Sequence, residues 1–135
     1  MSVSLRRLLT ISGGVEALGG VLTLIDPDVV IDVLLGGPAD NIAIVFTRFF
    51  GAGMFALGIA CVRAREYVTS PAGLAIVYSI TSYNVLAAVL ILWAAASLSL
   101  GGLLLKAAGL GHAVIGLLFV RGLMVLSAEL SKFNA

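Results

Sequence analysis

A long apolar run over residues 42–62 constrains the fold of this chain more than any other feature. The run is long enough to cross a bilayer as an α-helix, and Arg48 is the only charged residue inside it. Ala52, Ala56 and Ala60 recur at four-residue spacing, which leaves one helix face with only small side chains. We therefore expect a membrane-spanning helix that carries one cation and packs this face, which we call the alanine ridge, against a neighbouring helix. In the alternative, the alanine ridge faces lipid.

The composition extends this expectation to the whole chain. Of the 135 residues, 61% are hydrophobic and 11% are charged, whereas soluble domains carry about 25% charged residues. The net charge of +1 and the lack of a basic arm argue against nucleic acid as a partner. The expected partners are the lipid bilayer and, through helix contacts, other membrane subunits or a second copy of the chain.

Four apolar stretches separated by polar or glycine-rich breaks predict four transmembrane helices in a single domain. The predicted spans are residues 5–25, 42–62, 71–98 and 103–126. Asp26-Pro27 and Ser70-Pro71 each join a helix-capping side chain to a proline that suits the first turn. Residues 27–35 predict a short amphipathic helix along the membrane surface. The expected fold class is all-α, an integral membrane bundle of four transmembrane helices with a short surface helix between the first two.

Charged residues are divided unevenly between the two ends of the predicted bundle. The end that holds both termini carries the basic residues Arg6, Arg7, Arg63, Arg65, Arg121 and Lys132. The opposite end carries Lys106 and the aspartates Asp26, Asp28, Asp32 and Asp40. Because basic loops stay on the cytoplasmic side, we expect a multi-pass protein of a bacterial-type cytoplasmic cell membrane with both termini in the cytoplasm.

Three ionisable side chains lie inside the predicted spans, where such groups often have a function. At about 1.5 Å per residue, Glu16 and His112 lie roughly 13 Å, and Arg48 roughly 10 Å, from the outer ends of their helices. Tyr83 and Asn84 lie deeper on the third span and could extend this layer. We expect Glu16 and Arg48 to form a buried ion pair, because a buried charge is costly without a partner. In the alternative, Arg48 extends toward the outer surface and its aspartates.

These five side chains, Glu16, Arg48, Tyr83, Asn84 and His112, form the candidate binding cluster, and no catalytic residue is assigned. A Glu16–Arg48 pair would act as a structural lock or as part of a site, and we expect the lock. One histidine cannot form a zinc site alone, because zinc takes three or four protein ligands, so no metal is expected. The sequence contains no phosphate loop, nucleophile elbow or dinucleotide fingerprint.

Several local motifs are similar to those of one family. They are the glycine-rich first span, the Asp26-Pro27 break, the segment TRFFGAGMFALGIACVRAR at 47–65 and the segment GLGHAVIGLLF at 109–119. With these motifs the chain resembles the DoxX-like group of small bacterial four-helix membrane proteins. The resemblance implies the same four-helix layout over most of the chain. Some members are linked to quinone-reducing or quinol-oxidising complexes, so it also implies a quinone as a ligand, but it assigns no catalytic residue.

These observations lead to three hypotheses about function. In the first, the protein is a non-catalytic accessory or assembly component that acts through helix and lipid contacts without a cofactor. In the second, it is a binding or redox-associated subunit that holds a small hydrophobic ligand such as a quinone at the candidate cluster. The third, transport, is the weakest because no repeat pair or broken helix is visible. A closed cluster would favour the first hypothesis, and a cluster that opens to lipid or water would favour the second.

Overall fold

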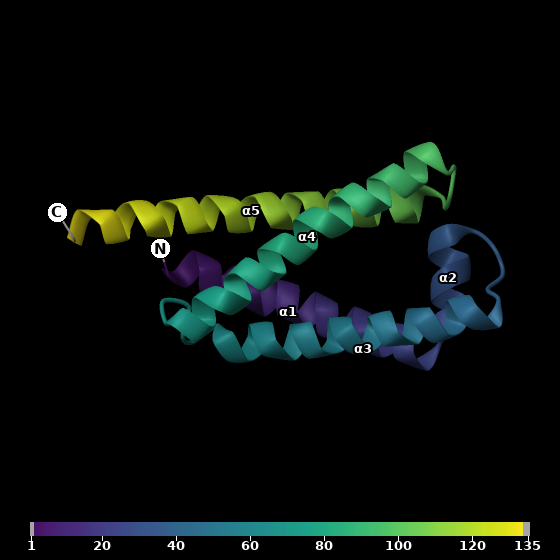
Figure 1. Cartoon of the computed structure of the whole chain (residues 1–135), viewed down its shortest axis with the longest axis horizontal. Helices are drawn as coiled ribbons and strands as arrows, with labels where there is room; N and C mark the ends of the chain where they lie inside the picture. Colours follow the sequence, from purple (N-terminus) through teal and green to yellow (C-terminus); the bar gives the residue numbers. More distant parts are fainter. Residues whose placement is uncertain (1, 134–135) are drawn as a thin grey trace.

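The computed structural model describes residues 2–133, with side chains for residues 5–132, as five helices (Figure 1). In chain order they are α1 (Ser2–Ile25), α2 (Pro27–Leu35), α3 (Asn41–Ala64), α4 (Pro71–Ser97) and α5 (Leu103–Phe133). All except α2 are long and apolar enough to cross a membrane. No strand occurs within residues 2–133. The predicted all-α bundle, with a short helix between the first two long ones, is confirmed.

Three helices begin where the sequence supplies a capping side chain. In each case the side-chain oxygen accepts a hydrogen bond from the backbone amide three residues further along the chain. The distances are 3.3 Å for Asp26, 2.7 Å for Asp40 and 3.0 Å for Ser70. These bonds satisfy amides that have no partner in the first turns of α2, α3 and α4.

The end of α5 differs from the prediction, because the helix continues to Phe133 rather than ending near 126. No glycine or proline follows Gly122 to stop it.

The four long helices form two antiparallel pairs. α1 packs along α3, α4 packs along α5, and contacts between the two pairs are sparser. α4 starts beside the end of α3 and crosses the bundle toward the start of α5 (Figure 1). Both termini lie at one end of the bundle, and α2 lies across the other end. There the Gly101 amide donates to the Leu35 carbonyl at 3.0 Å, which ties α2 to the α4–α5 connection.

Glycines make the contact between α1 and α3, where the two backbones touch. A Cβ atom on Gly20 would lie 2.5 Å from the Phe55 amide nitrogen, and one on Gly58 would lie 2.5 Å from the Ala17 amide nitrogen. Gly51 lies on the same face of α3 as Gly58, and both are buried. Such close approach matters in lipid, where van der Waals packing rather than the hydrophobic effect holds helices together.

The alanine ridge does not make this contact, so the predicted packing face of α3 is wrong. Ala52 and Ala56 are exposed and Ala60 is half-buried, whereas Gly51 and Gly58 are buried. Glycine lets a neighbouring backbone approach more closely than alanine does, and the glycine face is therefore the one turned toward α1. Successive residues of a helix point about 100° apart, so the alanine ridge faces out of the bundle.

The apolar core fills the end of the bundle that holds the termini. Its members come from the start of α1, the end of α3 and the turn after it, the start of α4 and the end of α5: Leu5, Leu9, Cys61, Ala64, Val68, Val77, Ile80, Phe119 and Leu126. Toward the α2 end, α3 and α4 diverge (Figure 1). On that side of the core, α1 and α4 carry buried polar residues, Ser12 and Glu16 on α1 and Thr81 and Asn84 on α4.

Candidate functional site

The contribution of α1 to the site is Glu16, a carboxyl group inside the bundle. Leu5, Leu9, Ser12 and Glu16 follow the three- and four-residue spacing of one helix face, and all four are buried. This face is apolar at the core end and polar nearer the middle of the bundle. Only 2% of Glu16 is exposed, and its Oε2 atom has no hydrogen-bond partner within the described part of the chain.

On α4 and α5, Asn84 and His112 are joined by a hydrogen bond. The Asn84 Oδ1 and His112 Nδ1 atoms lie 2.9 Å apart, and Asn84 Nδ2 donates to the Ile80 carbonyl at 2.8 Å. Because Nδ2 is the donor to Ile80, Oδ1 is the acceptor toward the imidazole, and His112 donates from Nδ1. The neutral imidazole then keeps Nε2 as an acceptor that this bond does not use.

Tyr83 connects the carboxyl of α1 to the imidazole of α5. Its hydroxyl lies close enough to the Glu16 carboxyl to interact with it. Its ring meets the His112 ring edge-on, with the two centroids 5.7 Å apart and the planes at 85°. Glu16, Tyr83, Asn84 and His112 thus form one continuous group from three helices, which we call the polar layer.

The polar layer is closed at two of its members and partly open at the other two. Glu16 and Asn84 are 2% and 0% exposed, whereas Tyr83 and His112 are half-buried. The accessible members of the layer are therefore Tyr83 and His112. The layer combines features of both expected cases, because its carboxyl is enclosed but its aromatic edge is accessible.

Arg48 is not part of the polar layer, and the predicted ion pair between Glu16 and Arg48 is not formed. The α1–α3 register explains why, because Gly58 packs at the level of Ala17, next to Glu16. Arg48 lies about 15 Å from Gly58 along α3 at 1.5 Å per residue. The prediction measured each depth from the end of its own helix and assumed that these ends were level.

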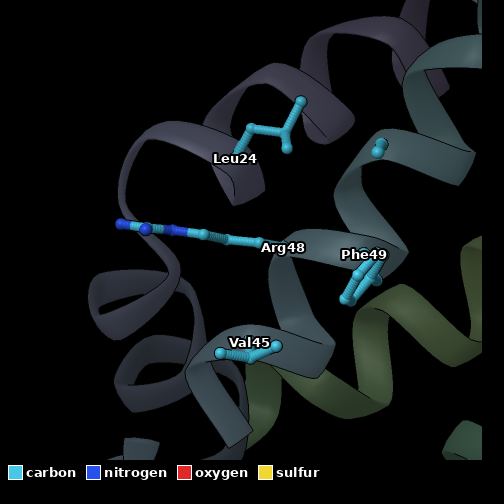
Figure 2. Close-up of a pocket in the computed structure, with 5 residues that line it drawn as sticks. Leu24, Val45, Arg48 and Phe49 are labelled. Atoms are coloured by element: carbon cyan, nitrogen blue, oxygen red, sulfur yellow. The ribbon is translucent and has the colours of Figure 1, made fainter.

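The guanidinium of Arg48 lies instead near the α2 end of the α1–α3 pair. Gly51 packs against the backbone of Leu24, so Arg48, one turn earlier on α3, is level with the end of α1. Figure 2 shows its side chain extending from α3 past Leu24, toward the bend between α1 and α2. Arg48 is exposed, as the alternative in which it extends toward the surface requires.

The side chains of the polar layer are hydrogen-bonding groups. Within residues 2–133, no group of three His, Cys, Asp or Glu side chains is placed to hold a metal ion. The layer presents a carboxyl, a phenol, an amide and an imidazole, which together can donate to and accept from a small polar head group.

Sequence reasoning missed Ser12, which lies one turn from Glu16 on the same buried face. Its Oγ atom is buried and, among the described residues, has no hydrogen-bond partner. The signal was the four-residue spacing between Ser12 and Glu16, which places both side chains on one face of α1. A serine is common in membrane helices, so this spacing gains meaning only once the buried face of α1 is known.

Comparison with known protein families, curated proteins and solved structures finds no match for this chain. The resemblance to the DoxX-like group therefore stays a prediction.

Proposed function

We propose that this small integral membrane protein binds a lipid-soluble molecule of the quinol class at the polar layer. The observation that carries the proposal is the Oε2 atom of Glu16, which is buried and has no hydrogen-bond partner within the described residues. A buried polar atom left unpaired costs about 1–3 kcal/mol, and such an atom in a folded protein calls for an explanation. A ligand that donates a hydrogen bond to this carboxyl would remove the cost.

The neighbours of Glu16 support a ligand with a hydroxylated aromatic ring. A quinol hydroxyl would donate to the Glu16 carboxylate, and the phenol oxygen of Tyr83 can accept a further hydrogen bond beside it. The imidazole of His112 adds an acceptor at the half-buried edge. Large apolar side chains are exposed along α4 and α5, including Leu86, Leu110 and Val114, so an apolar tail would remain among lipid chains.

Calorimetric binding of a short-chain benzoquinol to the purified protein in mild detergent tests this proposal. Glu16→Gln should weaken binding by about tenfold or more, because a hydrogen bond to a charged group contributes about 1.5–3 kcal/mol. Glu129→Gln is the matched control, since Glu129 is exposed near the end of α5 and outside the polar layer. Equal affinities for the wild-type protein and Glu16→Gln, at similar melting temperatures, would refute quinol binding at this layer.

A second candidate function is that of a non-catalytic accessory or assembly component. The observation that favours it is the alanine ridge, whose Ala52 and Ala56 are exposed on α3. Small residues let two membrane helices approach closely, so the ridge suits a helix of another subunit or of a second copy. Sedimentation of the detergent-solubilised protein with its co-purifying partners tests this role. Ala56→Leu should release a partner from the ridge and leave the isolated chain folded.

We further propose that the membrane is a bacterial-type cytoplasmic membrane and that both termini face the cytoplasm. The uneven distribution of basic residues supports this orientation, because Lys106 is, among the described residues, the only basic residue at the α2 end apart from Arg48. The aspartates of the connection that contains α2 then face the opposite side of the membrane.

A further inference from the structure

Arg48 borders an apolar groove at the α2 end of the α1–α3 pair. The groove has a volume of about 340 Å³ and is lined by Leu24, Val45, Arg48, Phe49 and Ala52. In Figure 2 the Arg48 side chain extends from α3 between Leu24 of α1 and Val45 of α3, and Phe49 projects from α3 away from the guanidinium. Four of the five lining residues are apolar, so the groove joins a hydrocarbon surface to one cation.

The guanidinium of Arg48 is free to bind an external anion. In the part of the chain that the structure describes, the ion pairs are Arg6–Glu66 at 2.6 Å and Arg65–Glu66 at 3.3 Å. Both lie at the termini end, away from Arg48. A guanidinium presents its donors in a planar fork that matches two oxygens of a phosphate.

Carboxylates are frequent on the segments at this end of the bundle. They are Asp26 at the bend between α1 and α2, Asp28 and Asp32 on α2, and Asp40 before α3. Measured along the α3 axis, Asp40 lies about 12 Å from Arg48, on the side where the helix starts. Along α3, Arg48 therefore lies between the apolar lining residues Phe49 and Ala52 on one side and the carboxylate of Asp40 on the other.

We propose that this groove is a binding site for one zwitterionic phospholipid of the leaflet on the α2 side. Its phosphate contacts Arg48, its ammonium group faces the aspartates, and an acyl chain lies against Leu24, Phe49 and Ala52. The order of these charges along α3 matches that of a phosphatidylethanolamine molecule. An anionic phospholipid fits less well, because its head group offers no cation to the aspartates and is repelled by them. The site is separate from the polar layer and does not depend on quinol binding.

Lipid retention by the full-length protein tests this site. The protein is reconstituted in vesicles containing equal parts of phosphatidylethanolamine and phosphatidylglycerol, extracted into mild detergent and analysed by native mass spectrometry. We expect the wild-type protein to retain phosphatidylethanolamine, and Arg48→Gln to reduce the retained fraction by about tenfold, as expected for loss of a charge-assisted phosphate contact. Arg121→Gln is the matched control, because Arg121 is an exposed arginine at the termini end.

Other variants separate a phospholipid from the alternatives. Arg48→Lys keeps the charge but loses the planar fork, so it should retain an intermediate amount of lipid and serves as the test if Arg48→Gln does not fold. Asp32→Asn should shift retention toward phosphatidylglycerol. Equal retention by the wild type and both Arg48 variants would overturn the proposal. So would preferential retention of phosphatidylglycerol by the wild type, or displacement of the lipid by soluble glycerophosphoethanolamine, which would indicate a site for free phosphate esters.

Discussion

The Asn84 Oδ1 atom and the His112 Nδ1 atom lie 2.9 Å apart and join α4 to α5 inside the bundle. Asn84 is fully buried and is held in turn by the Ile80 carbonyl, so it fixes the orientation of the imidazole. The same imidazole meets the edge of Tyr83, whose hydroxyl approaches Glu16. The conformation of His112 therefore affects the geometry of the whole polar layer.

The first prediction concerns this hydrogen bond. Asn84→Leu leaves the His112 Nδ1–H group without its acceptor, and we expect it to lower the free energy of unfolding by about 1–2 kcal/mol, near the upper limit for polar contacts in membrane proteins. Denaturant titration of the purified variants in one detergent provides the measurement. In a His112→Phe background, Asn84→Leu should lower the free energy of unfolding by less. The imidazole donor is then absent, so it cannot be left unpaired. An equal cost in both backgrounds would mean that Asn84 stabilises the bundle through packing alone.

The second prediction concerns the glycine contact between α1 and α3. Gly58→Leu places a side chain where the backbone of Ala17 lies, so it should push α1 and α3 apart. We expect it to lower the free energy of unfolding by about 3 kcal/mol, the upper range for overpacked cores. Ala56→Leu lies two residues away on an exposed face and is the matched control, with an expected effect within about 0.5 kcal/mol. Thermal unfolding in detergent compares the two variants. Comparable losses would show that the alanine ridge is packed rather than open.

The helix positions could be predicted from the sequence because their signals are local. The capping side chains of Asp26 and Ser70 act on amides three residues away, and the apolar runs between breaks define the spans. The packed face of α3 could not be predicted in this way. It depends on the register between α1 and α3, and this register is determined where Gly20 and Gly58 bring the two backbones together.

The same register explains which candidate site residues come together. Tyr83, Asn84 and His112 meet because α4 and α5 are neighbours through a short connection, and Glu16 faces them from α1. The position of Arg48 along the bundle depends instead on how far α3 extends beyond the end of α1. No local sequence signal predicts the length of this extension.

The third prediction concerns topology. A reporter fused after Ala135 should report the cytoplasm, and one inserted near Gly37 should report the opposite side, because the basic residues gather at the termini end. Paired activity and fluorescence reporters in bacterial cells provide the measurement. The reverse pattern would contradict the orientation and would place the aspartates around α2 in the cytoplasm.

The last prediction concerns the coupling between Glu16 and Arg48. Since the two side chains lie at different levels of the α1–α3 pair, Glu16→Gln and Arg48→Gln should act independently. Arg48→Gln alone should change the free energy of unfolding by less than about 0.5 kcal/mol, because Arg48 is exposed and forms no ion pair within the described residues. The double variant should match the sum of the single effects to within about 0.5 kcal/mol, the usual limit for separate sites. Unfolding of the four proteins in one detergent gives this cycle. A coupling of about 3 kcal/mol would instead indicate a buried ion pair in the membrane and a shift of α3 toward the level of Glu16.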